Sequence, residues 1–174
     1  MTSPRAASSR WRTALAAAAA SVVALPLLGD PGVAASINNA FGDLQGSWGG
    51  TGTVTYKSGT KERLRCRVQY TQQGTDDLQQ ALRCASDSYK FQINAYFKGA
   101  NNTLSGRWSE LTMQLSGTIS GSLNDGHING KLNGPGFAAS VQVTTTGTKQ
   151  IVNIEAPPDQ DITNVAIEVT RGGR

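Results

Sequence analysis

The stretch "GSWGGTGTVTYKSGTKERLRCRVQY", residues 46–70, decides the fold. It holds a tryptophan among glycines and then two alternating runs of apolar and polar residues, separated by the turn sequence "KSGT". Alternation with a period of two is typical of strands that bury one face. In the second run the apolar side chains share one face: Leu64, Cys66, Val68 and Tyr70. The stretch therefore predicts a β-hairpin with an apolar inner face and, from the arginines between those residues, a basic outer face.

The first 35 residues have the order of a secretory signal. Three arginines and no acid precede the apolar run 13–29, and small residues follow at Val33 and Ala35. That order predicts export by the general Sec-type route, with cleavage after Ala35. The apolar run is interrupted by Pro26, whereas a membrane span needs about 20 apolar residues. We therefore expect a periplasmic or secreted protein that does not span the membrane after cleavage.

The mature chain is expected to be one domain, with a lead-in at 36–46 and a β-barrel domain at 47–174. A chain of this length buries roughly two-thirds of the surface that it exposes when unfolded. Loss of the signal removes three arginines and Asp30, which lowers the formal net charge from +4 to +2. A charge this small favours a soluble protein and argues against nucleic acid as a partner.

The two cysteines, Cys66 and Cys84, are expected to pair because the exported chain enters an oxidising compartment. If they face each other across a hairpin, residues whose numbers sum to 150 are opposite one another. Val68 then meets Leu82 on the inner face, and the turn falls within 72–77. A metal site at the two cysteines is not expected, because it would need further ligands and the chain has a single histidine.

Alternation continues to the C-terminus in short runs separated by turn residues. The runs are 89–97, 103–110, 111–123, 127–134, 137–145, 150–155 and 162–170. They predict an all-β fold, a single antiparallel up-and-down β-barrel of about 8–10 short strands with one cross-strand disulfide. A sandwich would need longer crossover connections. A membrane barrel would need an apolar outer belt, but the outward positions here carry arginines and lysines.

Short motifs carry resemblances to known barrels. Gly-x-Trp at 46–48 resembles the opening of lipocalins and related calycin barrels for small ligands, which implies that Trp48 packs across the closed end. The arginine that stacks on this tryptophan in lipocalins cannot be placed from the sequence. "GRWSE", 106–110, is similar to the tryptophan-bearing strand of avidin-like barrels, without the rest of a biotin site.

Two groups of exported proteins also resemble this chain. The pattern of tryptophan and cysteine motifs over 46–110 is similar to exported bacterial proteins without an assigned activity, which implies the fold alone. One disulfide and a tryptophan-containing opening also resemble periplasmic inhibitors of secreted metalloproteases. That second resemblance implies that the N-terminal tail, 36–41, enters a protease cleft.

We expect a non-enzymatic binding protein without a cofactor. His127 stands alone in a turn, and no serine, aspartate or glutamate lies in a recognisable catalytic setting. The leading hypothesis is a barrel cavity that holds a small apolar or amphipathic ligand. Its candidate lining residues are Trp48, Tyr70, Phe91, Phe97, Trp108, Met113 and Phe137.

The competing hypothesis is a filled barrel that acts through its surface, as a protease inhibitor or by binding an anionic component of the cell envelope. The surface candidates are the arginines of the predicted hairpin and its neighbour: Arg63, Arg65, Arg67 and Arg83. With the register above, Arg67 faces Arg83. Like charges directly opposite each other are unfavourable in the free protein, which suggests an anionic partner.

Overall fold

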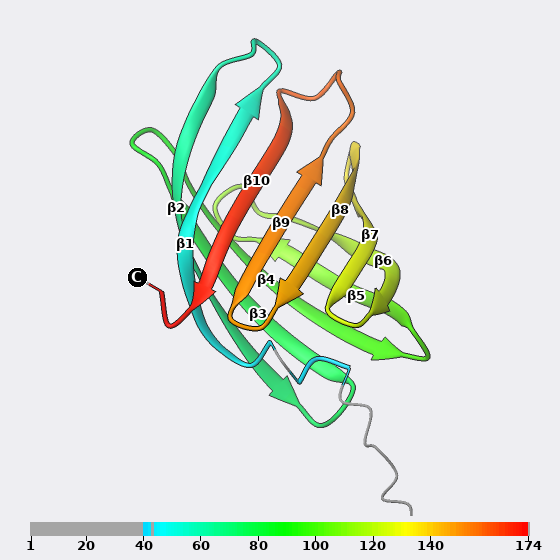
Figure 1. Ribbon diagram of the computed structural model, residues 1–174. Coiled ribbons are helices and arrows are strands. Elements are labelled where there is room, and N and C mark those ends of the chain that lie inside the picture. The colour runs from blue at the N-terminus through cyan, green and yellow to red at the C-terminus, as the bar shows by residue number, and fades with distance from the viewer. Residues whose placement is uncertain (1–39, 43, 174) are drawn as a thin grey trace, which may run out of the picture. The chain divides into compact units, whose positions relative to one another are not determined.

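Ten strands, each paired antiparallel with the next, close into a barrel when β10 pairs with β1 (Figure 1). The structure is a computed structural model that describes residues 40–42 and 44–173. The strands are β1 (Gly46–Tyr56), β2 (Lys61–Gln73), β3 (Asp77–Ala85), β4 (Lys90–Ala100), β5 (Thr103–Glu110), β6 (Leu115–Asn124), β7 (His127–Gly134), β8 (Phe137–Thr146), β9 (Lys149–Glu155) and β10 (Ile162–Arg171). The predicted up-and-down barrel is confirmed.

The register that the cysteines predicted is also confirmed. Cys66 pairs with Cys84 across β2 and β3, and every pair in that ladder sums to 150, from Arg65–Ala85 to Gln73–Asp77. The two cysteines form a disulfide and are almost completely buried, so the bond lies on the inner face of the barrel.

One predicted strand is wrong at its start. The alternation Leu111, Met113, Leu115 indicated a strand from 111 to 123, but β6 begins at Leu115 and residues 111–114 form a turn. Gln114 has a φ of 58°, a left-handed conformation that does not continue a strand. Leu111 and Met113 consequently project from a turn instead of lining the inner face.

The tight turns follow from residues that tolerate positive φ. Asn101 and Asn102 have φ values of 49° and 60° between β4 and β5. Asp125 and Gly126 have φ values of 44° and 78° between β6 and β7. Two central residues with positive φ match the twist of antiparallel strands, so these positions connect neighbouring strands without a longer loop.

A plug of apolar side chains closes one end of the barrel. Phe41 and Leu44, which precede β1, are 1% and 7% exposed, and Trp48 is 1% exposed. A methyl group at Gly99 would lie 3.1 Å from Phe41 Cε2, so β4 leaves room for the phenylalanine ring. Phe41 is thus part of the plug at this end of the barrel.

Trp48 is held in that plug by polar as well as apolar contacts. Its Nε1–H donates to the carbonyl of Leu44 at 2.8 Å, and the ring of Tyr70 meets it edge-on at 6.5 Å. The guanidinium of Arg171, at the end of β10, lies 4.7 Å from the centre of the Trp48 ring. Arg171 also donates to the Gln45 carbonyl at 2.8 Å. The arginine that the sequence alone could not place is therefore Arg171.

The predicted signal, 1–35, and most of the lead-in before β1 lie outside the described residues. Within 40–42 and 44–173 there is no helix long and apolar enough to cross a membrane.

Candidate functional site

The inner face of the barrel is fully buried at some positions and accessible at others. Near the plug, Leu78 and Val169 are 1% exposed, and on β1 and β2 the buried positions extend to Val54 and Leu64 at the other end. Partly buried inward side chains near the plug are Phe97, Ile128 and Val143. Toward the other end, where the β3–β4, β5–β6 and β7–β8 turns lie, other inward apolar side chains are only half-buried. They are Leu82, Phe91, Ile93, Leu115, Leu132, Phe137, Val152, Ile154 and Val165.

Half-burial on the inner face means that the side chains do not fill the interior at this end. Eight strands enclose a space that side chains can just fill, and the diameter grows with strand number. This barrel has ten strands. We call its accessible end the open end and the space inside it the lumen.

Glycines on the inner wall let large aromatic rings lie flat against that wall. Trp108 on β5 is paired with Gly117 on β6, and a methyl group at Gly117 would lie 2.7 Å from Trp108 Cζ2. Gly134 on β7 also lies against the Trp108 ring. A methyl group at Gly134 would lie 3.0 Å from Trp108 Cζ2 and 2.6 Å from Phe137 Cε1. The indole therefore covers the glycines of two neighbouring strands and leaves the lumen clear.

A polar bridge lies between the lumen and the plug. The hydroxyl of Tyr70, on β2, donates to Gln150 Oε1 at 2.8 Å, and Gln150, on β9, donates to Thr145 Oγ1 at 3.1 Å. Gln150 is 1% exposed, and burial raises the pKa of the Tyr70 hydroxyl. Gln80, opposite Tyr70 on β3, faces inward and is half-buried. These polar groups form the floor of the lumen.

At the open end, hydrogen bonds tie the first hairpin to the turn after β3. Glu62 accepts from the hydroxyl of Tyr56 at 3.0 Å and from the backbone N–H of Ser88 at 3.2 Å, and the Ser88 hydroxyl donates to it as well. Hydrogen bonds from Ser86, Ser88 and Tyr56 lower the pKa of Glu62 to about 2. Glu62 is therefore ionised at neutral pH and already engaged within the protein.

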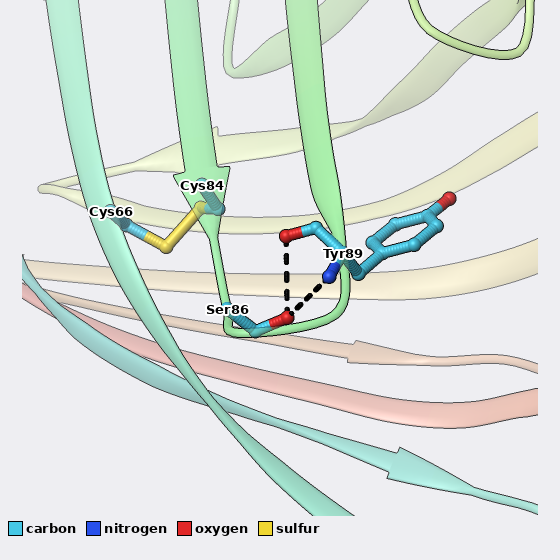
Figure 2. The surroundings of a disulfide bond; sticks show 4 residues. All are labelled: Cys66, Cys84, Ser86 and Tyr89. Atoms are coloured by element: carbon cyan, nitrogen blue, oxygen red, sulfur yellow. Dashed lines mark hydrogen bonds between the residues drawn. A yellow bond between two sulfur atoms is a disulfide. The ribbon is translucent and has the colours of Figure 1, made fainter.

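The disulfide leads directly into that turn. Figure 2 shows Cys66 and Cys84 on neighbouring strands and Ser86 just after Cys84. The Ser86 hydroxyl accepts from the backbone N–H of Tyr89 at 2.9 Å and donates to the Tyr89 carbonyl at 3.2 Å. The cross-link and these bonds fix the position of the Tyr89 ring at the open end.

A buried carboxylate holds the turn after β5. Glu110 is 5% exposed and accepts from the backbone N–H groups of Gln92 (3.0 Å), Thr112 (3.0 Å) and Met113 (2.5 Å). Burial alone would raise the pKa of Glu110, but these N–H groups outweigh it and lower that pKa. The turn 111–114 therefore has a fixed conformation that the charge on Glu110 supports.

The predicted cavity residues fall into three places. Phe91, Phe97, Trp108 and Phe137 all face inward, but only Trp108 and Phe137 are in ring contact, at 5.6 Å between ring centres. Phe91 lies near the open end of β4, and Phe97 lies further along the same strand, opposite Leu78 near the plug. Tyr70 and Trp48 are 6% and 1% exposed, so neither lines the accessible part of the interior. Met113 is 52% exposed in the turn at the open end, so its predicted position on the inner face is wrong.

The aliphatic half of the lumen wall was not among the predicted residues. Val152 and Ile154 on β9 and Val165 on β10 belong to it. The alternation in "QIVNIE" and "ITNVAIEVT" indicates that these positions face inward. It does not indicate which inward residues lie near the open end.

The four predicted surface arginines lie together on the outer wall. Arg63, Arg65 and Arg67 alternate with inward residues along β2, and Arg83 on β3 is paired with Arg67. All four are exposed, and within the described residues none of them forms an ion pair. The predicted juxtaposition of Arg67 and Arg83 is confirmed, and whether they bind an anion remains a prediction.

No catalytic or metal site is assembled in the part of the chain that the structure describes. His127 is exposed, and its Nδ1 lies 3.3 Å from Thr144 Oγ1. The described residues contain no group of three or more histidine, cysteine, aspartate or glutamate side chains placed to hold a metal ion.

Solved structures share this architecture at low sequence identity. Rv2717c from M. tuberculosis superimposes with a TM-score of 0.64 and 13% identity, over 79% of this chain and 98% of that one. The S-type phycobiliprotein lyase CPES from Guillardia theta gives a TM-score of 0.52 and 13% identity, over 75% of this chain and 89% of that one. At these identities the likeness shows the barrel fold alone.

No protein-family model matches the sequence. No curated protein matches it either. The comparisons support the predicted antiparallel barrel, and the resemblances to lipocalins and to protease inhibitors stay predictions.

Proposed function

We propose that this protein is an exported, non-enzymatic carrier whose barrel takes one small apolar or amphipathic ligand through its open end. The observation that carries the proposal is the group of half-buried apolar side chains that face inward near the open end. Apolar side chains that face inward but keep contact with solvent, such as Phe91, Leu132 and Val152, are stabilised when an apolar ligand covers them.

The charges of the barrel interior restrict the chemistry of the ligand. The inward carboxylates near the open end, Glu62 and Glu110, already accept hydrogen bonds from the protein. At the floor, Tyr70 and Gln150 satisfy each other. A charged group deep in the lumen would have no partner and would lose its hydration. The ligand is therefore apolar along its body, and any charge that it carries stays at the open end.

The absence of enzymatic activity is part of this proposal. One structural neighbour is named as a lyase, and that activity is assigned to the neighbour and not to this protein. In the described part of this chain, the lumen is lined mostly by hydrocarbon and aromatic side chains, with amides and hydroxyls at its floor and Glu62 and Glu110 near the open end. The hydroxyls of Tyr56 and Ser88 donate to Glu62, whose pKa is lowered to about 2. A carboxylate with so low a pKa is a weak base at neutral pH, which supports binding as the function.

Two adjacent residues of β9 test the proposal. Val152 faces the lumen, and Ile151 is 45% exposed on the outer wall. The change Val152→Thr keeps the side-chain shape but places a hydroxyl against the ligand. We expect it to weaken binding of the fluorescent probe anilinonaphthalene sulfonate about tenfold, because the hydroxyl is desolvated without a partner.

Ile151→Thr is the matched control, and its affinity for the probe should equal that of the unsubstituted protein. Fluorescence titration of the protein purified from exporting cells, with unfolding curves to show that both variants fold, provides the measurement. Equal effects of the two substitutions, or no binding by the unsubstituted protein, would show that the lumen does not take an apolar ligand.

A further inference from the structure

We propose that the open end of the barrel docks onto an anionic lipid surface through a docking rim, which consists of Leu111, Met113, Arg67, Arg83 and Lys90. This inference deepens the proposed function, because it names a membrane as the place where the carrier exchanges its ligand. It rests on three features of the rim: exposed apolar side chains, a fixed turn and a neighbouring unpaired basic wall.

The first feature is a pair of large apolar side chains at the tip of a turn. Leu111 is 51% exposed and Met113 is 52% exposed. Among the described residues, the other exposed large apolar side chains are Tyr96 and Ile151, which stand singly on different strands. The other turns between the strands consist mainly of glycine, asparagine, aspartate, serine, threonine and proline, and their one large aromatic residue, Tyr89, is half-buried. Two exposed apolar residues in a single turn are thus a local exception.

The second feature is that the turn is held in place. Glu110 accepts the backbone N–H groups of Thr112 and Met113, and the Leu111 N–H donates to the Gln92 carbonyl at 2.9 Å. The hydroxyl of Tyr89 lies 3.4 Å from Met113 Sδ. A turn that could fold back would bury its apolar side chains in the lumen. This one is fixed with both of them in solvent, which is the conformation that insertion into a lipid interface needs.

The third feature is the charge beside the turn. Arg67 is paired with Arg83 on β3, Arg83 with Gln92 on β4, and Gln92 bonds to Leu111. One cross-strand row therefore runs from the arginines to the apolar tip. With strands about 4.8 Å apart, Arg83 lies about 10 Å from Leu111 along that row.

In the neighbouring cross-strand row, Ala85 on β3 is paired with Arg65 on β2 and with Lys90 on β4, so two more cations lie beside the turn. Asp87, in the turn after β3, is the exposed acid of this region. None of the rim cations forms an ion pair within the described residues. The rim therefore carries excess positive charge that is free to meet the phosphates of lipid headgroups.

These features act together only at an anionic lipid surface. The apolar tip lowers its free energy by leaving water for the acyl boundary, and the arginines contact headgroup phosphates at the same depth. A soluble acidic polysaccharide would use the arginines and leave Leu111 and Met113 in water. Because the tip borders the open end, docking also lets an apolar ligand pass between membrane and lumen without crossing bulk water.

The test is flotation with lipid vesicles, using protein purified from cells that export the full chain. Vesicles that contain phosphatidylglycerol should bind the protein, and vesicles of phosphatidylcholine alone should bind it weakly. The double change Leu111→Ser, Met113→Ser should lower vesicle affinity tenfold or more, as roughly expected for apolar side chains of this size. Arg83→Ser should lower it about fivefold, as expected for one cation at an anionic surface.

Matched controls lie on the far side of the barrel. Ile151→Ser removes an equally exposed apolar residue from β9, and Lys131→Ser removes an exposed cation from β7. Neither should change binding to vesicles. If Arg83→Ser weakens binding but the double serine variant does not, the surface recognises charge alone and the lipid-docking proposal is wrong.

Probe binding separates this proposal from the carrier function. The rim residues do not line the lumen, so every rim variant should bind an uncharged probe, N-phenyl-1-naphthylamine, as the unsubstituted protein does. Normal probe binding without vesicle binding would overturn the docking proposal and leave the carrier function intact. Vesicle binding without probe binding would support docking and contradict the carrier.

Discussion

The change Trp48→Ala is expected to lower the free energy of unfolding by about 3–5 kcal/mol, the range for deletion of a large buried aromatic side chain. Trp48 is 1% exposed in the plug and contacts elements from both ends of the chain: Leu44 before β1 and Arg171 at the end of β10. Alanine would leave a cavity at the point where the barrel closes. The plug cannot collapse into that cavity without moving β1 away from β10.

Urea unfolding of the oxidised protein provides the measurement, with two variants for comparison. Trp48→Phe keeps a buried ring but loses the hydrogen bond to the Leu44 carbonyl, so its effect should be smaller. Arg171→Ala removes the cation above the ring and should cost about 1 kcal/mol. An effect of Trp48→Ala within about 0.5 kcal/mol of zero, as for an ordinary surface position, would contradict the structural role of the plug.

Removal of the disulfide is expected to lower the free energy of unfolding by about 3 kcal/mol. Cys66 and Cys84 are separated by 18 positions, and the cross-link restricts that segment in the unfolded chain. In the native barrel the two residues already face each other in the β2–β3 ladder, so loss of the bond should leave the fold intact.

Two comparisons isolate the cross-link. Reduction of the unsubstituted protein keeps both sulfur atoms in the core, whereas Cys66→Ala with Cys84→Ala also removes their volume. Both forms should unfold at a lower urea concentration than the oxidised protein, and reductant should not affect the double variant. An unchanged unfolding midpoint after complete reduction would show that the disulfide does not stabilise the barrel.

The first hairpins could be predicted because two independent features of the sequence agreed. Alternation placed Leu64, Val68 and Leu82 on one face, and the cysteines fixed the register that brings Val68 opposite Leu82. A one-residue slip would have moved every apolar side chain to the outer wall. The number of strands followed from the turn residues in the same way.

The error at 111–114 has a specific cause. Leu111 and Met113 continue the alternation of β6, so the sequence pattern alone favours a longer strand. The carboxylate of Glu110 instead takes the N–H groups of Thr112 and Met113 and forms a turn. Such a competition between a side chain and the strand ladder depends on three-dimensional geometry that periodicity does not contain.

The lumen and the closing arginine depend on contacts between residues distant in the sequence. Arg171 reaches Trp48 only because β10 pairs with β1. Whether Trp108 would fill the lumen or lie on its wall depends on Gly117 and Gly134, which the register of β5, β6 and β7 brings beneath the indole. The sequence could therefore predict a barrel, whereas the accessible interior at one end required the structure.

The central claim, a barrel that carries an apolar ligand, is tested most directly by native mass spectrometry of the protein from cells that export the full chain, purified without detergent. A carrier should show the polypeptide mass from Ser36, two hydrogens lighter for the disulfide, plus one discrete additional mass that organic extraction removes. The bare polypeptide mass from such a preparation, unchanged by extraction, would contradict the central claim.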